Sequence, residues 1–313
     1  MLELPQEDFA RYLMAFSAYR IVLPTSMDND YRTYETLFDI HVTMCSVTNK
    51  HIIFDMKNTR FIAANLFSVL GCILNYSFKN NGHTFSFDNV KPDLDNIMRR
   101  NGFARHFNIP RIPDPNNTVI EYWIFDADTE NLEQFEKYTF MNIFERKDMP
   151  NMSPAVKHSM VDNMLEIFNN VIDHGHTDRV FVSGQYFVKK EQLVVTITDM
   201  GNTIKQNVTA YATEHLQEIP NPTLLWAIIE GNSTKTTSAP GGLGISRLLQ
   251  FLRLNEGSFT LISEDEYLQV TKKGKTFKSL EVPFPGTIVS IAFNMSDRGS
   301  YRLKNETDSQ ILL

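Results

Sequence analysis

Cysteine is nearly absent from this chain, and positive charge is in the minority. The 313 residues include two cysteines, Cys45 and Cys72, whose spacing matches no metal-binding motif. Two cysteines are too few for a disulfide framework, so we expect a protein of the reducing cytoplasm. The formal net charge of -7 argues against a nucleic-acid partner, because phosphate backbones are bound by clustered lysine and arginine.

Long hydrophobic runs and targeting signals are also scarce. The opening residues, MLELPQEDFARYLMAF, have no basic start and no small-residue cleavage site, so we expect no signal peptide. Residues 61–78 approach the length of a membrane span, but Asn65, Ser68 and Asn75 interrupt them. Because a bilayer requires about 20 apolar residues, we interpret this stretch as a buried helix and expect no membrane partner.

What the chain does have is the composition of a folded protein. Hydrophobic residues make up 42% and charged residues 21%, which is enough apolar material for a core and too little charge for disorder. A length of 313 residues predicts two domains. The segment RIPDPNNT, residues 111–118, combines prolines with turn-forming residues, so we predict domains at 1–112 and 117–313.

The order of predicted elements differs on the two sides of this boundary. Before it, strands and helices alternate, at 51–56, 61–78, 83–90 and 92–103. After it, a strand at 119–125 is followed by helices up to about residue 174. A hairpin at 180–187 and 193–199 comes next, and two further strands follow at 258–263 and 287–293. The predicted fold class is therefore α/β followed by an α+β sandwich, with helices on one face of a mostly antiparallel sheet.

A helix predicted from about Ser159 to His174 has one apolar and one polar face. At about 100° per residue, its polar face collects Ser159, Asp162, Asn163, Glu166, Asn169, Asn170 and Asp173. A polar face of this kind is usually solvated surface. It has no lysine or arginine to balance its carboxylates, however, and a metal or a phosphate-bound Mg²⁺ would balance them.

The motif TDMGNT, residues 198–203, places a carboxylate beside a glycine. Asp199 ends an apolar strand, and Gly201 lets the backbone turn where a β-carbon would block it. Such a carboxylate can accept a hydrogen bond from an exocyclic amine such as that of adenine. A plain strand-to-turn Asp-x-Gly is the alternative interpretation.

The stretch GNSTKTTSAPGGLGISRLLQFL, residues 231–252, brings three glycines to a predicted helix start. Free amides and the positive end of the helix dipole favour phosphate at this place. The preceding hydroxyl-rich run around Lys235 could close over a nucleotide as a lid. A simple packing turn is the alternative.

Four segments in this order resemble the nucleotide-binding boxes of the GHKL ATPase superfamily: EIFNNVIDHG (166–175), DMGNT (199–203), PGGLG (240–244) and PGTIVSIAF (285–293). That superfamily includes gyrase, Hsp90, histidine kinases and anti-sigma-factor serine kinases, and the resemblance covers about residues 117–313. It implies a Bergerat-type sandwich with ATP and Mg²⁺ as cofactors, Glu166 as general base, Asn170 as the Mg²⁺ ligand and Asp199 as the adenine reader. The further nucleotide-binding residues that it implies are Asp173, Gly201, Lys235, Gly241, Gly242, Leu243, Gly244 and Thr287.

Two residues depart from the family pattern, and the ends of two boxes indicate one branch of the family. Thr203 stands where a second glycine is usual and could narrow the adenine pocket, and Pro240 replaces an opening glycine and could stiffen the lid hinge. The ending His174-Gly175 and the lid start GNSTK are similar to the anti-sigma serine-kinase branch. His174 has a simpler interpretation as a helix end capped by Gly175. With His176 it has no third ligand nearby, so zinc is set aside.

Residues 20–105 resemble a STAS domain, the fold of anti-sigma-factor antagonists. In those antagonists an Asp-Ser-Ser-Gly run opens a helix and its serine accepts phosphate, whereas this chain has Ala63, Ala64, Asn65 and Leu66 there. The acceptor hydroxyl is missing. A regulatory or docking role is therefore the expectation for this domain.

Two functions follow from these resemblances. In the first, the protein is a serine kinase or ATPase in which Glu166 activates a hydroxyl for in-line phosphoryl transfer. In the second, ATP orders the lid and switches a docking surface with little turnover. The expected partners are ATP and a regulatory protein, with a homodimer left open.

Overall fold

The N-terminal part of the chain folds into a small parallel sheet with helices on one face. The computed structural model describes residues 18–232, 234, 243–304 and 306. Strands pair in parallel in the order β1 (Ala18–Val22), β3 (His51–Asp55) and β5 (Thr84–Asp88). The other elements of this part are β2 (Ser26–Met27), α2 (Tyr31–Cys45), β4 (Phe61–Ile62), α3 (Phe67–Asn81) and α4 (Pro92–Arg100). The predicted alternation of strands and helices is confirmed.

The rest of the chain builds a five-stranded antiparallel sheet. Its order is β10 (Ser258–Thr271), β11 (Gly274–Asn294), β9 (Gln192–Asp199), β8 (Arg179–Phe187) and β6 (Val119–Asp126). The helices of this part are α5 (Leu132–Thr139), α6 (Pro154–Asn170), α7 (Ile204–Glu214), α8 (Thr223–Ala227) and α9 (Leu243–Asn255). The short β7 (Asn151–Met152) pairs with β12 (Ser300–Tyr301). The predicted strands are present, and β10 and β11 extend well beyond them.

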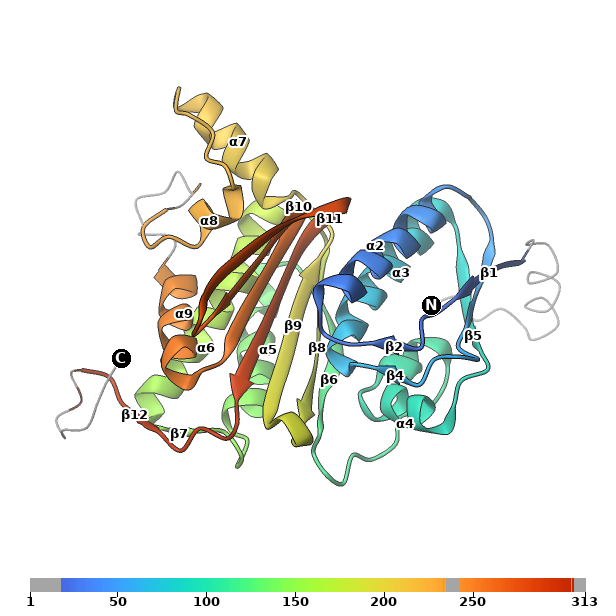
Figure 1. Ribbon diagram of the computed structural model, residues 1–313, viewed down its shortest axis with the longest axis horizontal. Helices are drawn as coiled ribbons and strands as arrows, with labels where there is room; N and C mark the ends of the chain where they lie inside the picture. Colours follow the sequence, from blue (N-terminus) through green and yellow to red (C-terminus); the bar gives the residue numbers. More distant parts are fainter. Residues whose placement is uncertain (1–17, 233, 235–242, 305, 307–313) are drawn as a thin grey trace.

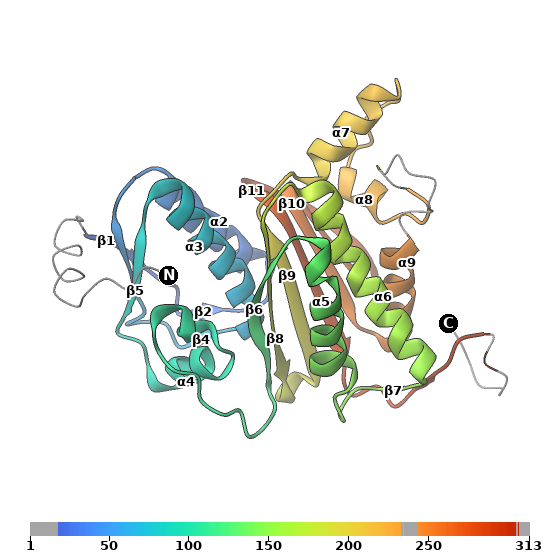
Figure 2. The same cartoon turned by 180° about the vertical axis from the view of Figure 1, so that it is seen from behind.

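Helices cover both faces of the five-stranded sheet (Figures 1 and 2). On one face lie α5, α6 and α9, as predicted. On the other face lie α2 and α3, which separate this sheet from β1, β3 and β5. The sequence patterns describe the antiparallel sheet with helices on one face only, because the helices of the second face come from the N-terminal part.

The two parts of the chain share buried apolar packing. One cluster lies between the five-stranded sheet and α5, α6 and α9. The other runs from the parallel sheet through α2 and α3 to the opposite face of the five-stranded sheet. Within it, the rings of Phe38 in α2 and Phe284 in β11 lie 5.0 Å apart. The N-terminal part is therefore packed directly on the sheet, although residues 111–118 between them form no helix or strand, as a linker would.

The predicted helix at 61–78 begins later than expected. Residues 61–62 form β4, residues 64–66 form a single 3-10 turn, and α3 starts at Phe67. The backbone there is directed to the sheet, since Ala64 N donates to Gln185 Oε1 at 2.8 Å and Ser68 N donates to Ser183 Oγ at 2.8 Å. The stretch is buried, as predicted. Among the described residues, no helix is long and apolar enough to cross a membrane.

Replacing Ser183 with alanine should destabilise the contact between α3 and the sheet. Ser183 Oγ accepts from Ser68 N and donates to Asn65 O, both at 2.8 Å, and all three residues are fully buried. The variant leaves the buried Ser68 N without a partner and leaves Asn65 O with only its bond from Ser68 Oγ, which we expect to cost about 2 kcal/mol. Urea unfolding measures this change. The exposed Ser26→Ala is the control, and equal stability of the two variants would contradict the packing described.

Candidate functional site

A single large pocket brings together residues from most of the predicted boxes. It has an empty volume of about 930 Å³, partly open to solvent, and lies between α6, the end of β9, α7, α8 and the start of α9. Its polar lining comprises Glu166, Asn170, His174, Asp199, Asn202, Asn207, Asn232, Thr234 and Thr287. Its apolar lining includes Ile167, Ile197, Ile204, Val208, Trp226, Ala227, Ile245 and Leu261.

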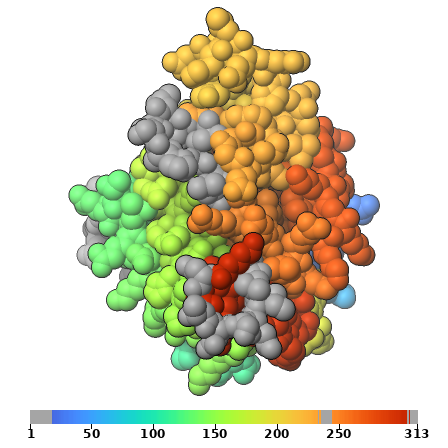
Figure 3. Space-filling view, turned by 90° about the vertical axis from the view of Figure 1, so that its left-hand side faces the viewer, coloured from blue at the N-terminus to red at the C-terminus, as the bar shows by residue number. Residues whose placement is uncertain are grey.

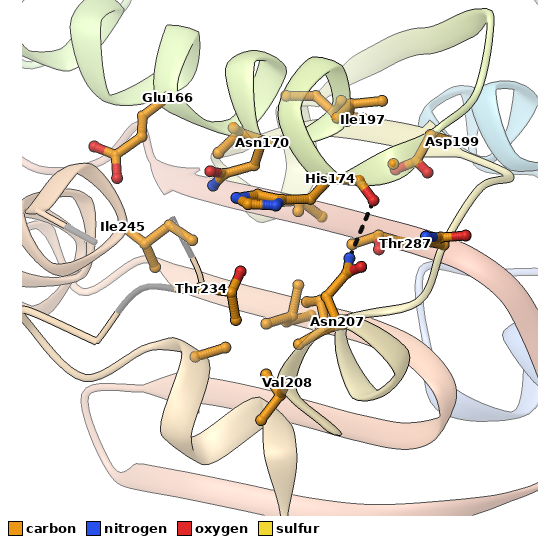
Figure 4. Close-up of a pocket in the computed structure, with 18 of the residues that line it drawn as sticks. Glu166, Asn170, His174, Ile197, Asp199, Asn207, Val208, Thr234, Ile245 and Thr287 are labelled. Carbon is orange, nitrogen blue, oxygen red and sulfur yellow. Dashed lines mark hydrogen bonds between the residues drawn. The ribbon is translucent and has the colours of Figure 1, made fainter. Parts of the chain in front are cut away.

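Helix α6 and the turn that continues it supply three of the polar groups on one face. Ser153 caps its first turn by accepting from Val156 N at 3.2 Å, and Pro154 follows at the first helical position. Glu166, Asn170 and His174 are spaced by four residues, so they point the same way into the pocket (Figure 4). Of the predicted polar face, Glu166 and Asn170 thus line the pocket.

Other residues of the predicted polar face lie elsewhere. Asp162 and Asp173 are exposed, and neither lines the pocket. Asn163 is buried, with 3% of its surface exposed, because α5 and α9 both pack against α6. After α6 the chain continues as a π-turn over residues 171–175, and the left-handed residue is His176, with φ 48°. The expectation that Gly175 is the left-handed cap is therefore wrong.

Asp199 is the most unusual group in the pocket. It ends β9, pairs in register with Thr287 of β11, and has 3% of its surface exposed. No described residue offers a hydrogen bond to its Oδ1. Removal of the carboxyl from water raises the pKa of Asp199 to about 8. A buried oxygen without a partner is costly in a folded protein, so this one fits a ligand that donates to it.

The bend after Asp199 depends on glycine. A β-carbon at Gly201 would lie 1.9 Å from the carbonyl oxygen of Gly175, and Asn202 N donates to that same oxygen at 2.5 Å. Gly201 thus lets the bend rest on the end of α6, although it does not itself line the pocket. A β-carbon at Gly286 would lie 2.1 Å from the carbonyl oxygen of Asp199. The two glycines thus allow close backbone packing on both sides of Asp199.

Thr203 does not narrow the pocket. It caps α7, where Thr203 Oγ1 accepts from Gln206 N at 3.1 Å and Thr203 N is bonded by the Gln206 side chain at 2.9 Å. Its hydroxyl also donates to Glu264 Oε2 at 2.8 Å, and it is absent from the pocket lining. The expectation of a narrowed pocket is wrong because the side chain is engaged in starting the helix.

The start of α9 faces Glu166 across the pocket. Gly244 N donates to Glu166 Oε2 at 2.5 Å, and a β-carbon on Gly244 would lie 2.2 Å from that oxygen. A backbone amide at the helix start is thus occupied by a carboxyl group of the protein itself, and the predicted contact with phosphate stays a prediction. Leu243 begins the helix. The predicted contacts of Lys235, Gly241, Gly242, Pro240 and the side chain of Leu243 lie outside the described residues.

Helices α7 and α8 contribute residues that the motifs do not indicate. Asn207 Nδ2 donates to the carbonyl oxygen of His174 at 3.1 Å and so ties α7 to the end of α6 (Figure 4). Val208 and Trp226 add apolar wall. In the space-filling view α7 and α8 form the gold top of the molecule, above α9 (Figure 3). The only sequence signal for α7 is its capping pair, Thr203 and Gln206.

Side chains that could ligate a metal ion are dispersed over the described part of the chain. No group of three or more His, Cys, Asp or Glu residues within the described part of the chain could hold a metal ion. Asn170 contributes one amide oxygen to the pocket.

Comparison with known proteins adds no relative. No family model matches the chain, and no curated protein matches it.

Proposed function

We propose that the pocket binds Mg-ATP and that residues 117–313 form a GHKL-type nucleotide-binding domain. The observation that carries the proposal is Asp199, a buried carboxyl whose Oδ1 has no partner among the described residues and which lines a large pocket. The exocyclic amine of adenine would supply the missing donor. Guanine presents a carbonyl oxygen at the corresponding position, so it would leave this acceptor unsatisfied.

The other lining groups fit the phosphate end of the same ligand. Asn170 and the N-terminus of α9 lie away from Asp199, on the side of the pocket where Glu166 and Ile245 are found (Figure 4). Phosphate oxygens would accept a hydrogen bond from the Gly244 amide, and Asn170 would hold Mg²⁺ through its side-chain oxygen. The bound cation would neutralise phosphate charge. His174 and Asn207 close the pocket between these two ends.

The reaction that suits this site is phosphoryl transfer to a hydroxyl group, as in an anti-sigma-type serine kinase or an ATPase. Glu166 would accept the proton of the attacking serine hydroxyl or water, while the bond from the γ-phosphorus to the bridging oxygen breaks. Phosphate entry at Gly244 would release the Glu166 carboxyl from its present hydrogen bond. A regulatory protein is the proposed acceptor or partner.

A nucleotide-gated interaction module is the second candidate, and the N-terminal part favours it. Residues Ala63–Leu66, where a STAS-like antagonist carries its acceptor serine, are at most 2% exposed and are packed on the five-stranded sheet. The chain therefore offers no acceptor hydroxyl at these four positions, and the serine that follows them in the sequence, Ser68, is fully buried. In this alternative, ATP changes a docking surface without turnover.

Isothermal titration of the full chain tests the proposal. We expect ATP with Mg²⁺ to bind with one site per chain and GTP to bind at least about tenfold more weakly. Equal affinity for ATP and GTP would contradict the role of Asp199 as a base reader. Failure of both nucleotides to bind would remove the proposed function.

The Asn170→Ala variant should uncouple nucleotide binding from magnesium. Asn170 is the only pocket amide of α6, and its removal deletes the proposed protein ligand of Mg²⁺. We expect ATP affinity in excess Mg²⁺ to fall about 10- to 100-fold, and ATP affinity in EDTA to stay within about threefold of the wild type. Asn169→Ala, one residue away and outside the lining, is the control. An equal loss of ATP affinity in EDTA would show that Asn170 binds the nucleotide rather than Mg²⁺.

A further inference from the structure

Glu266 is a buried acidic residue that the proposed reaction does not use. It lies in β10 with 5% of its surface exposed. Its carboxyl group accepts three hydrogen bonds from the first turn of α8: Thr223 N to Oε1 at 3.0 Å, Thr223 Oγ1 to Oε2 at 3.0 Å and Leu224 N to Oε2 at 2.8 Å. Burial of a carboxyl group is costly unless donors surround it, and here helix α8 provides them.

Helix α8 needs this support because it is too short to be stable alone. It spans Thr223–Ala227, and the residue before it, Pro222, offers no side-chain cap. A single helical turn is unfavourable in isolation, and its first amides require acceptors. Glu266 supplies them from the rigid sheet. At the other end, Asn232 Nδ2 donates to the carbonyl oxygen of Trp226 at 2.9 Å.

What α8 carries into the pocket is an aromatic ring. Trp226 and Ala227 both line the cavity, next to Ile204 and Val208 of α7. The ring of Trp226 lies 6.3 Å from that of Tyr211 in α7, so the two helices support each other. Val208 faces the pocket from the side opposite Asn170 and His174 (Figure 4). The α7 and α8 side thus contributes most of its lining as apolar side chains, whereas the proposed Mg²⁺ ligand Asn170 lies on α6 and the Gly244 amide lies at the start of α9.

We propose that Trp226 is the wall against which the base of the bound nucleotide packs, and that Glu266 is the positioning residue that holds Trp226 there. The proposal rests on the proposed nucleotide function and adds to it the contact on the apolar side. Stacking of a base on an aromatic ring contributes substantially to affinity and requires a fixed ring orientation. Glu266 does not touch the ligand and acts only through α8.

The experiment uses Trp226 as its own reporter. The full chain contains two tryptophans, so Trp123→Phe leaves Trp226 as the only source of indole emission. We expect adenosine and ATP to change this emission and tripolyphosphate to leave it unchanged. In the same background, Glu266→Gln should raise the Kd for ATP and adenosine alike, by about tenfold. It should also make Trp226 more accessible to acrylamide before any ligand is added.

Conservative and control variants separate positioning from a general loss of structure. Trp226→Phe keeps an aromatic wall and should bind ATP within about threefold of the wild type, whereas Trp226→Ala should lose at least about tenfold. Glu121→Gln, a charge removed at the far edge strand β6, should leave emission and affinity unchanged. If Glu266→Gln fails to fold, Thr223→Val removes one of the three hydrogen bonds and should show a smaller effect of the same kind.

Two results would overturn the inference. A change in Trp226 emission with tripolyphosphate but none with adenosine would show that Trp226 does not pack against the base. Unchanged acrylamide quenching and unchanged affinity in Glu266→Gln would show that Glu266 does not position α8. Absence of nucleotide binding by the wild type is a different failure, since it removes the proposed function as well, and the acrylamide comparison in ligand-free protein still tests the role of Glu266.

Discussion

The Asp199→Asn variant is expected to gain stability at alkaline pH while losing affinity for ATP about 100-fold. The affinity for ATP falls because the carboxyl group of Asp199, whether ionised or neutral, can accept a hydrogen bond from the adenine amine. The amide of asparagine can instead turn its own NH₂ donor toward that amine. The gain follows because Asp199 is buried without a partner for its Oδ1 among the described residues. Function and stability therefore oppose each other at this residue.

The sign of the pH dependence follows from the raised pKa. Burial lifts the pKa of Asp199 from 3.8 to about 8, so between these values the folded chain holds a proton that the unfolded chain has released. This group therefore makes the wild type lose stability as pH rises from about 4 to about 8, and above that range the full penalty remains. At 1.36 kcal/mol per pKa unit the penalty has an upper bound of about 6 kcal/mol. Asparagine does not titrate, so the variant lacks this loss.

Urea unfolding at pH 5, 7 and 9 measures the effect. We expect the stability of Asp199→Asn relative to the wild type to increase by at least about 2 kcal/mol between pH 5 and pH 9. Asp178→Asn is the control with opposite sign, because a hydrogen bond from Lys79 lowers the pKa of Asp178 and its loss removes stability at neutral pH. A pH-independent difference for Asp199→Asn would show that the carboxyl is not desolvated.

Local patterns were sufficient to predict the elements that carry their own periodicity. The strands around 119–125, 180–187 and 193–199 are short runs rich in β-branched and aromatic residues, and the polar face of α6 is visible in its four-residue spacing. Asp199 ends an apolar strand beside a glycine, a common environment, and it was singled out because its motif stands in order with the other segments that resemble nucleotide-binding boxes. These signals are local, so they survive without knowledge of the partner elements.

The features that the sequence patterns did not predict depend on packing between segments far apart in the chain. Because α7 and α8 fold over the end of the sheet, Asn207 and Trp226 line the pocket and Glu266 holds the start of α8. Nothing in the sequence around these three residues indicates that placement. The late start of α3 has the same origin. An isolated apolar run predicts a helix from residue 61, whereas hydrogen bonds to β8 hold residues 61–66 in another conformation.

The Glu166→Gln variant separates binding from turnover. Glutamine keeps an acceptor oxygen for the Gly244 amide and nearly the same volume, so we expect ATP affinity within about threefold of the wild type. It cannot accept the proton of an attacking hydroxyl, so release or transfer of the γ-phosphate should fall about 100- to 1,000-fold. Single-turnover assays with labelled ATP and Mg²⁺ measure this rate.

Asp162→Asn is the matched control for this change. Asp162 lies one turn before Glu166 on the same helix and is exposed outside the pocket, so its substitution removes an equal charge without touching the site. Its turnover should equal that of the wild type. Unchanged phosphate release in Glu166→Gln would remove Glu166 as the base. Tight Mg-ATP binding by a wild type that shows no turnover would favour the nucleotide-gated module, because the Glu166 contact with Gly244 would then serve to sense phosphate and not to activate a nucleophile.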